Sequence, residues 1–156
     1  MVEVLVGAGG WSYFNIPGDR LRNYATAFKT VEVNFTYYTI PPISLVRSWR
    51  SRVPNDFEFT VRCNRELIQE LEQNSINSSL DIFERMEKIC QILKARVLHI
   101  LITKKSIIDN ELIDNIDKFL SSANYSNLQL AWEIRGIANN QYQRIFNVLK
   151  KPPSGS

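Results

Sequence analysis

The sequence predicts an α/β protein: a parallel (β/α) barrel of the TIM type, incomplete, with about five of the eight βα units. Three observations predict it. Short apolar runs alternate with amphipathic helical stretches, the runs begin about 30 residues apart, and each run alternates apolar with polar residues. An open doubly wound sheet is covered by helices on both faces and needs strands that are apolar throughout, whereas a barrel lumen tolerates polar groups.

Five runs predict the strands. In the second run one face is apolar and the other polar, with Val31, Val33 and Phe35 alternating with Glu32, Asn34 and Thr36. The third and fifth runs have the same alternation. The five predicted strands span residues 2–7, 30–38, 57–64, 96–103 and 128–135.

Between the strands, apolar residues at helical spacing predict five helices. Ser78 with Asp81 would form a capping box at the start of the third helix. The polar segment 69–79, QELEQNSINSS, predicts a surface loop. The apolar stripes are Leu21, Tyr24, Ala25 and Phe28; Leu45, Val46 and Trp49; Phe83, Met86, Cys90 and Leu93; Leu112, Ile113, Ile116, Phe119 and Leu120; and Tyr142, Ile145, Phe146 and Leu149.

Length and composition favour one globular domain over residues 1–150, followed by a tail at 151–156 that we expect to be truncated or vector-derived. The net charge of +3 is too small to indicate nucleic-acid binding by itself. No apolar run has the roughly 20 residues of a membrane span, and we expect no signal peptide before the first strand. Cys63 and Cys90 have no metal spacing and fall on apolar positions, which predicts reduced core residues of a cytoplasmic protein.

The glycine-rich segment GAGGWSYF, residues 7–14, does not fit a nucleotide-binding loop. A dinucleotide fingerprint needs a third glycine where Ser12 stands, and its acid should close the second strand, whereas Glu32 lies inside that strand. No Gly-Lys-Ser/Thr follows, so a P-loop is also absent. The sequence favours a tight turn where the first strand leaves the core.

In a barrel, Gly7, Gly9 and Gly10 would form the first βα loop, at the end where active sites gather. They would let the backbone approach a ligand. Trp11 and Tyr13 would then flank the mouth; alternatively, Trp11 plugs the top of the barrel.

Five polar side chains share the predicted lumen face: Glu32, Asn34, Arg62, Glu133 and Arg135. We expect them to converge at one end of the sheet. As a site, the arginines would clamp an anionic group and Glu32 or Glu133 would act as the catalytic acid or base. As a structural alternative, the same charges would neutralise one another in an internal ion network.

A metal or cofactor is not expected. Glu32, Asn34 and Glu133 could supply oxygen ligands, but the single histidine, His99, lies in the middle of a strand, which excludes a zinc cluster or a Ser-His-Asp triad. If His99 faces inward, it is a further lumen candidate.

Several motifs together resemble a known family. VGAGGWSY resembles the opening Gly-Thr-Ser-Gly-Trp-Ser-Tyr of the YecE-like family (domain of unknown function 72), and VEVNFTYY resembles its Val-Glu-Ile-Asn-x-Thr-Phe-Tyr strand. PPISLVRSW, FEFTVRCNR and LAWEIRG resemble later segments, with Arg62 in the place of a lysine and Arg65 at a later arginine. Ile102 and Gly136 depart from the family's glutamine and histidine. The resemblance implies a TIM-type barrel of unassigned activity.

Three functions remain open, and catalysis itself is undecided. The first is binding or processing of a small phosphate- or carboxylate-bearing ligand at the carboxyl-terminal mouth, by Gly9, Gly10, Trp11, Tyr13, Asn34, Arg62 and Arg135. The second is a non-catalytic partial barrel whose exposed edges favour a homo-oligomer or a partner chain that completes it. The third is phosphodiester processing on nucleic acid. The residues for it form only a thin basic and aromatic surface: Lys104, Lys105, Lys150 and Lys151 with Trp11 and Tyr13.

Overall fold

A computed structural model describes residues 3–136 and 139–152. Its five strands form one parallel sheet in the order β1-β2-β3-β4-β5. The order follows the sequence and reverses nowhere, unlike that of a doubly wound sheet. The predicted parallel α/β fold is therefore confirmed. The strands are β1 (Gly7–Gly9), β2 (Thr30–Val33), β3 (Glu58–Arg62), β4 (Val97–Ile102) and β5 (Gln129–Ile134).

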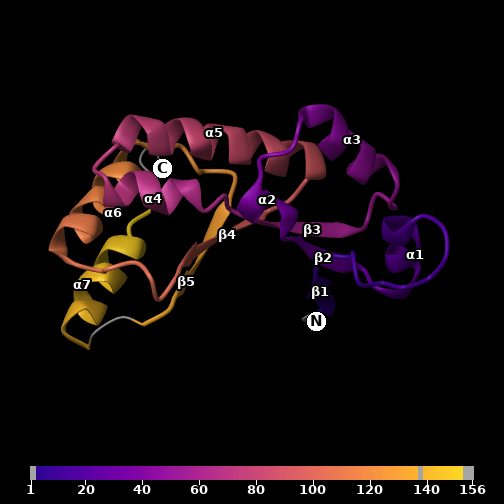
Figure 1. The fold of residues 1–156 in the computed structure, drawn as a ribbon, viewed down its shortest axis with the longest axis horizontal. Helices are drawn as coiled ribbons and strands as arrows, with labels where there is room; N and C mark the ends of the chain where they lie inside the picture. The colour runs from indigo at the N-terminus through magenta and orange to yellow at the C-terminus, as the bar shows by residue number, and fades with distance from the viewer. Residues whose placement is uncertain (1–2, 137–138, 153–156) are drawn as a thin grey trace.

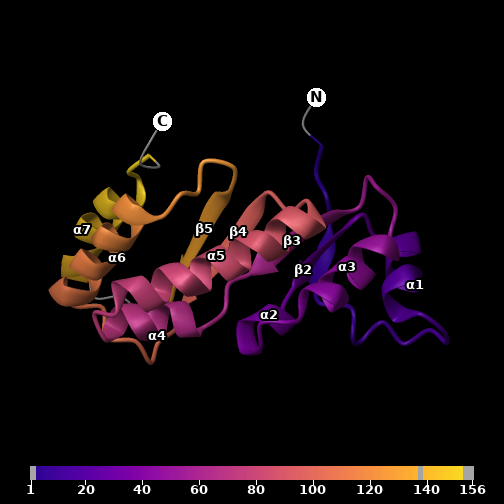
Figure 2. The same ribbon diagram turned by 90° about the horizontal axis from the view of Figure 1, so that it is seen from above.

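The strands form an arch, and the helices lie over its outer side (Figure 1). Figure 2 shows the same arrangement from above, with both ends of the described chain on the same side of the molecule. No helix within the described ranges is long and apolar enough to cross a membrane. The helices are α1 (Arg20–Ala27), α2 (Phe35–Tyr38), α3 (Ile43–Ser51), α4 (Glu66–Glu72), α5 (Ile76–Leu93), α6 (Asn110–Ser122) and α7 (Asn139–Leu149).

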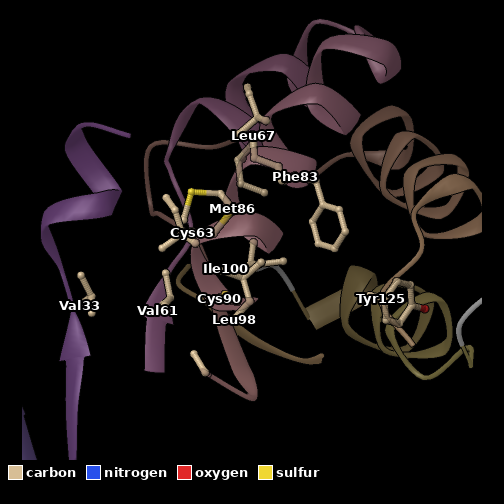
Figure 3. Close-up of a cluster of buried hydrophobic side chains, with 14 of the residues drawn as sticks. Val33, Val61, Cys63, Leu67, Phe83, Met86, Cys90, Leu98, Ile100 and Tyr125 are labelled. Atoms are coloured by element: carbon tan, nitrogen blue, oxygen red, sulfur yellow. The ribbon is translucent and has the colours of Figure 1, made fainter. Parts of the chain in front are cut away.

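The core lies between the sheet and the helices. Because successive strand residues point to opposite faces, every second residue of β2, β3 and β4 is buried against the helices. Cys63, Phe83, Met86 and Cys90 fill the space beneath α5 (Figure 3). The predicted apolar face of the third strand is confirmed, since Phe57, Phe59, Val61 and Cys63 are all buried. In the second strand Val31 and Val33 are buried as predicted, but Phe35, predicted on the same face, lies in a helix after the strand and is 50% exposed.

Both cysteines are free and buried, as predicted. Burial raises the pKa of the Cys63 thiol well above its usual range, and it raises the pKa of Cys90 to about 12. The thiols are therefore protonated at neutral pH and act as small apolar side chains.

The second strand is shorter than predicted. It ends at Val33, and residues 35–38 form the short helix α2. The aromatic residues of FTYY have high β propensity, but Thr36 overrides it. Its fully buried hydroxyl lies 2.9 Å from the carbonyl oxygen of Val33 and 2.6 Å from that of Arg62, which turns the chain out of the sheet.

The polar segment 69–79 is not a loop, which corrects the prediction. It contains the end of α4, a turn at residues 73–75 and the start of α5. Leu67, Ile68 and Leu71 bury one face of α4. The capping-box prediction is also wrong, because α5 begins at Ile76 and Ser78 already lies inside the helix.

The first strand falls on the glycines instead of on residues 2–7. Gly7 pairs with Thr30 and Gly9 pairs with Glu32. A Cβ atom at Gly7 would collide with the carbonyl oxygen of Thr30, so this close approach requires glycine. The loop begins only at Gly10, which has φ +91°. The preceding apolar run does not enter the sheet, and Val6 is 71% exposed; position 2 lies outside the described residues.

Tyr24 of α1 connects β1 with β2. Its hydroxyl accepts a hydrogen bond from the Ala8 amide at 2.8 Å and donates one to the Thr30 carbonyl at 2.9 Å. The side chain is 2% exposed. This phenol supplements the short pairing between the two strands.

We predict that Tyr24→Phe lowers the free energy of unfolding by about 1–3 kcal/mol, because the substitution leaves a buried donor and acceptor without partners. Urea unfolding of the two proteins measures the difference. Tyr13→Phe is the control, since Tyr13 is 96% exposed and its substitution should change stability by less than about 0.5 kcal/mol. Equal losses in the two variants would contradict the role given to Tyr24.

Candidate functional site

Five side chains form a continuous chain of polar contacts across the concave face, here called the ion network. Arg62 Nη2 lies 2.9 Å from Glu32 Oε1, and Glu32 Oε2 lies 2.7 Å from His99 Nδ1. His99 Nε2 lies 3.0 Å from Glu133 Oε2. Glu133 Oε1 then lies 2.6 Å from both Nε and Nη2 of Arg135. The ion network therefore runs from β2 to the residue that follows β5.

The strand register explains why these residues meet. Arg62 is aligned with His99, and His99 with Ala131, two residues before Glu133. Glu32 is aligned with Thr60, so its side chain spans β3 to reach His99 on β4. Side-chain alternation places the ion network opposite the buried face, on the side that the described helices leave uncovered.

The sequence predicted convergence of five side chains: Glu32, Asn34, Arg62, Glu133 and Arg135. The structure brings four of them together, whereas Asn34 has no contact in the ion network and lines a pocket beside it. The link between them is His99, which the sequence offered only as a lumen candidate. The sequence pattern that indicates the orientation of His99 is its position between Leu98 and Ile100, whose side chains are buried on the opposite face. Their functional roles remain predictions.

The exposure of the side chains to solvent is lowest at His99 and increases toward both ends of the ion network. The His99 side chain is 15% exposed, Glu32 and Arg62 are each 22% exposed, and Arg135 is 49% exposed. The central pairs are therefore less screened by water than the outer pair. The hydrogen bond from Arg135 lowers the pKa of Glu133, with smaller contributions from the charges of Arg135, His99 and Arg62.

The central imidazole can carry a proton between two carboxylates. A ring that donates to both Glu32 and Glu133 carries a proton on each nitrogen, whereas a neutral ring donates to only one of them. The arrangement is suited to general acid–base chemistry, because a proton lost at one carboxylate contact can be replaced through the other.

A pocket of about 470 Å³, here called the aromatic pocket, opens beside the ion network. Trp11 forms part of its wall and packs edge-to-face on Trp49 of α3, with ring centroids 5.4 Å apart. Tyr13 is almost fully exposed. Of the seven predicted ligand-binding residues, all except Arg135 line this pocket. The lining is Gly9, Gly10, Trp11, Ser12, Tyr13, Asn34, Phe35, Tyr38, Trp49 and Arg62.

A second pocket of about 490 Å³, here called the basic pocket, lies at the carboxyl ends of β3, β4 and β5. Four basic side chains and one acidic side chain, Glu72, contribute to its wall. The basic residues are Arg65, Lys104, Lys105 and Arg135. Sequence reasoning did not assign Arg65 and the two lysines to a mouth site. The available signal was their position directly after the third and fourth strands.

The four lysines considered for nucleic acid lie in two places. Lys104 and Lys105 line the basic pocket, whereas Lys150 and Lys151 lie at the end of the chain. Lys151 Nζ lies 2.6 Å from Asp117, and Lys150 Nζ lies 4.2 Å from the Phe146 ring centroid. Two of the four lysines therefore already have a partner: Lys151 a carboxylate and Lys150 an aromatic ring.

A metal site receives no support from the geometry. The described residues contain no group of three or more His, Cys, Asp and Glu side chains placed to hold an ion. Glu32 and Glu133, which could have supplied oxygen ligands with Asn34, each contact an arginine and His99 instead.

Residues 5–151 match the family model described as protein of unknown function DUF72. The chain belongs to the DUF72 family. The resemblance inferred from the sequence motifs is thereby confirmed. No curated protein matches this DUF72 chain.

Two crystal structures of a DUF72 family protein from Enterococcus faecalis V583 are similar to it in fold. The structure at 2.52 Å resolution has a TM-score of 0.62 and 20% sequence identity, over 94% of this chain and 58% of that chain. The structure at 3.10 Å has a TM-score of 0.63 and 21% identity, over 89% and 52%. The DUF72 chain described here thus spans little more than half the length of these structures.

We predict that the contribution of Glu133 to stability is lost in acid. Because the folded pKa of Glu133 is lowered, the ionised carboxylate stabilises the fold above the ordinary Glu pKa of about 4.3 and stops doing so as the pH falls through the lowered folded value. The difference in unfolding free energy between the parent and Glu133→Gln should therefore shrink across this window. Urea unfolding at several pH values measures it.

Glu84→Gln is the matched control, since Glu84 lies on the exposed surface of α5, away from the ion network. A gap between parent and Glu133→Gln that stays constant with pH would contradict the Arg135–Glu133 contact.

Proposed function

We propose that this DUF72 chain binds a small anionic ligand, bearing phosphate or carboxylate, at the carboxyl end of its sheet. The observation that carries the proposal is the basic pocket, in which four cationic side chains and one carboxylate surround about 490 Å³. Active sites of parallel α/β folds lie at this end of the strands.

Arg65 and the two lysines are the side chains available to an anion. Arg62 and Arg135 already contact carboxylates, so the ion-network alternative accounts for their charges in this structure. By contrast, within the described residues Arg65, Lys104 and Lys105 form no salt bridge. A phosphate or carboxylate bound among them would form charge-assisted hydrogen bonds.

The ion network supplies a means of processing the ligand. Arg135 belongs both to the basic pocket and to the ion network, so a bound anion would lie near Glu133 and the proton of His99. Glu32 and Glu133 are the proposed acid and base, connected through the imidazole. Binding and catalysis can be tested separately, because substitutions of the lysines address binding and substitutions of the carboxylates address catalysis.

We propose in addition that the arch is part of a TIM-type barrel whose open edges associate with another chain, as in a homo-oligomer. Support comes from the consecutive parallel order of the strands and from the placement of the helices outside the arch. Among the described residues, β1 and β5 each pair on one side only. Next to β1, Val4 and Val6 are 80% and 71% exposed, and such edges favour association.

We predict that replacing both Lys104 and Lys105 by Ala weakens the binding of inorganic phosphate by at least about tenfold, because charge-assisted hydrogen bonds are lost. Isothermal titration calorimetry measures the affinity. Lys88→Ala is the matched control, since Lys88 is exposed on α5 and lies outside the basic pocket. Absence of phosphate binding to the parent protein, or an equal loss in the control, would contradict the proposal.

We predict that the purified chain sediments as an oligomer at micromolar concentration. Changing Val4 and Val6 together to Lys should shift it toward the monomer, because charges at a sheet edge oppose pairing. Ile107→Lys is the control, since Ile107 is 78% exposed but lies between β4 and α6, away from β1. A folded parent chain that is strictly monomeric would overturn the association proposal and leave the anion proposal unaffected.

A further inference from the structure

The aromatic pocket exposes an unusual amount of aromatic surface. Phe35 is 50% exposed, Tyr38 is 66% exposed and Tyr13 is 96% exposed. All three line the same pocket together with Trp11 and Trp49. Large aromatic side chains gathered at one concave place offer stacking surfaces to a flat ligand, since rings pair favourably face-to-face with an offset or edge-to-face.

Two polar side chains also line this pocket, and each has a buried atom without a hydrogen-bond partner in the described part of the chain. The atoms are Oδ1 of Asn34 and Nε of Arg62. Arg62 uses Nη2 for Glu32, which leaves its Nε–H unused. Buried polar atoms are nearly always paired, so an unpaired donor and an unpaired acceptor on one pocket are informative.

No hydrogen bond within the described residues fixes the orientation of the Asn34 amide. Asn34 stands at the N-cap of α2, yet its side chain makes no capping hydrogen bond. Its Nδ2 occupies space that only glycine leaves open, because a Cβ on Gly9 would lie 2.5 Å from that atom. Since Val33 pairs with Val61, Asn34 and Arg62 are neighbours at the ends of adjacent strands. The unpaired acceptor and the unpaired donor therefore belong to residues that are adjacent across two strands.

We infer that the aromatic pocket binds a planar ring that carries an N–H and a C=O next to each other, as in a lactam. The ring carbonyl accepts from Arg62 Nε–H, and the ring N–H donates to Asn34 Oδ1 after the amide turns toward the pocket. The ring face stacks on the aromatic lining. This inference goes beyond the proposed function, because it assigns a ligand class to the aromatic pocket, which shares no lining residue with the basic pocket.

The competing structural explanation is a hydrogen bond between Arg62 and Asn34 themselves, formed after a small movement of either side chain. In that case a ring would bind by stacking alone, and its N–H would contribute nothing. The two explanations differ in whether methylation of the ring nitrogen matters.

The test compares 2-pyridone with 1-methyl-2-pyridone, which has the same ring without the donor. Titrations are followed by NMR shifts of the tryptophan indole N–H groups and by tryptophan fluorescence. We expect 2-pyridone to bind about tenfold more tightly, the difference associated with one hydrogen bond. Uracil as a third probe distinguishes a nucleobase from a simpler lactam, and either result supports the inference.

Two variants test the protein side. Arg62→Lys keeps the positive charge beside Glu32 but removes Nε–H, and Asn34→Leu removes the acceptor; each should reduce the preference for 2-pyridone about tenfold. Thr60→Val, on the same sheet face but outside the aromatic pocket, should not change it. Equal affinity of the parent for both pyridones, or no binding of either, would overturn the inference even if no variant folds.

Because the pyridones are uncharged and the phosphate titration depends on Lys104 and Lys105, the two proposals can fail separately. Phosphate binding without pyridone discrimination would leave an anion site alone. Pyridone discrimination without phosphate binding would place the ligand in the aromatic pocket and refute the anion proposal.

Discussion

Each strand of this sheet places half of its side chains on a face that the described helices do not cover. In β2, β3 and β4 the apolar half is buried on the outer side of the arch, where helices exclude water from it. The other half must be compatible with partial exposure, and at its centre this chain uses charge. Placing Glu32, Arg62 and His99 close together would be unfavourable if their charges were not opposed. The strand register brings these side chains together, so opposite charges have to be adjacent in the ion network. This arrangement therefore has a structural reason as well as the proposed functional one.

The ends of β2 and β3 are held together by two buried side chains. Thr36 lies within hydrogen-bond distance of the carbonyl oxygens of Val33 and Arg62, and Asn64 donates from Nδ2 to the Thr36 carbonyl at 3.0 Å. The other amide atom of Asn64, Oδ1, accepts from the Glu66 amide, at the start of α4. These contacts fix the backbone on which the aromatic pocket and the ion network depend.

The periodic features of the fold could be predicted from the sequence, because alternation and helical stripes are local patterns. The failures have a shared cause in contacts between distant residues. FTYY has the composition of a strand, but the Thr36 hydroxyl finds the carbonyl of Arg62, 26 residues away. The glycines form the first strand because the neighbouring strand lies too close for a side chain.

The candidate site could likewise be predicted only where it depends on local sequence patterns. Side-chain alternation placed Glu32, Arg62 and Glu133 on one face, but not their order of contact. That order depends on the relative alignment of β2, β3 and β4, which lets Glu32 reach across one strand to His99. The cations of the basic pocket follow the strand ends, and a loop has no periodicity from which their direction could be derived.

The glycine composition of β1 also affects how the molecule fluctuates. Only three residues pair with β2, and two of them have no side chain to add packing. Regions with few buried contacts open at lower free energy than the core, so β1 is the part of the sheet from which we expect local unfolding to begin. Gly9 and Gly10 also line the aromatic pocket, so opening of this strand would dismantle one of its walls. A ligand bound as inferred in the aromatic pocket would therefore oppose the opening of this strand, because it binds only the closed state.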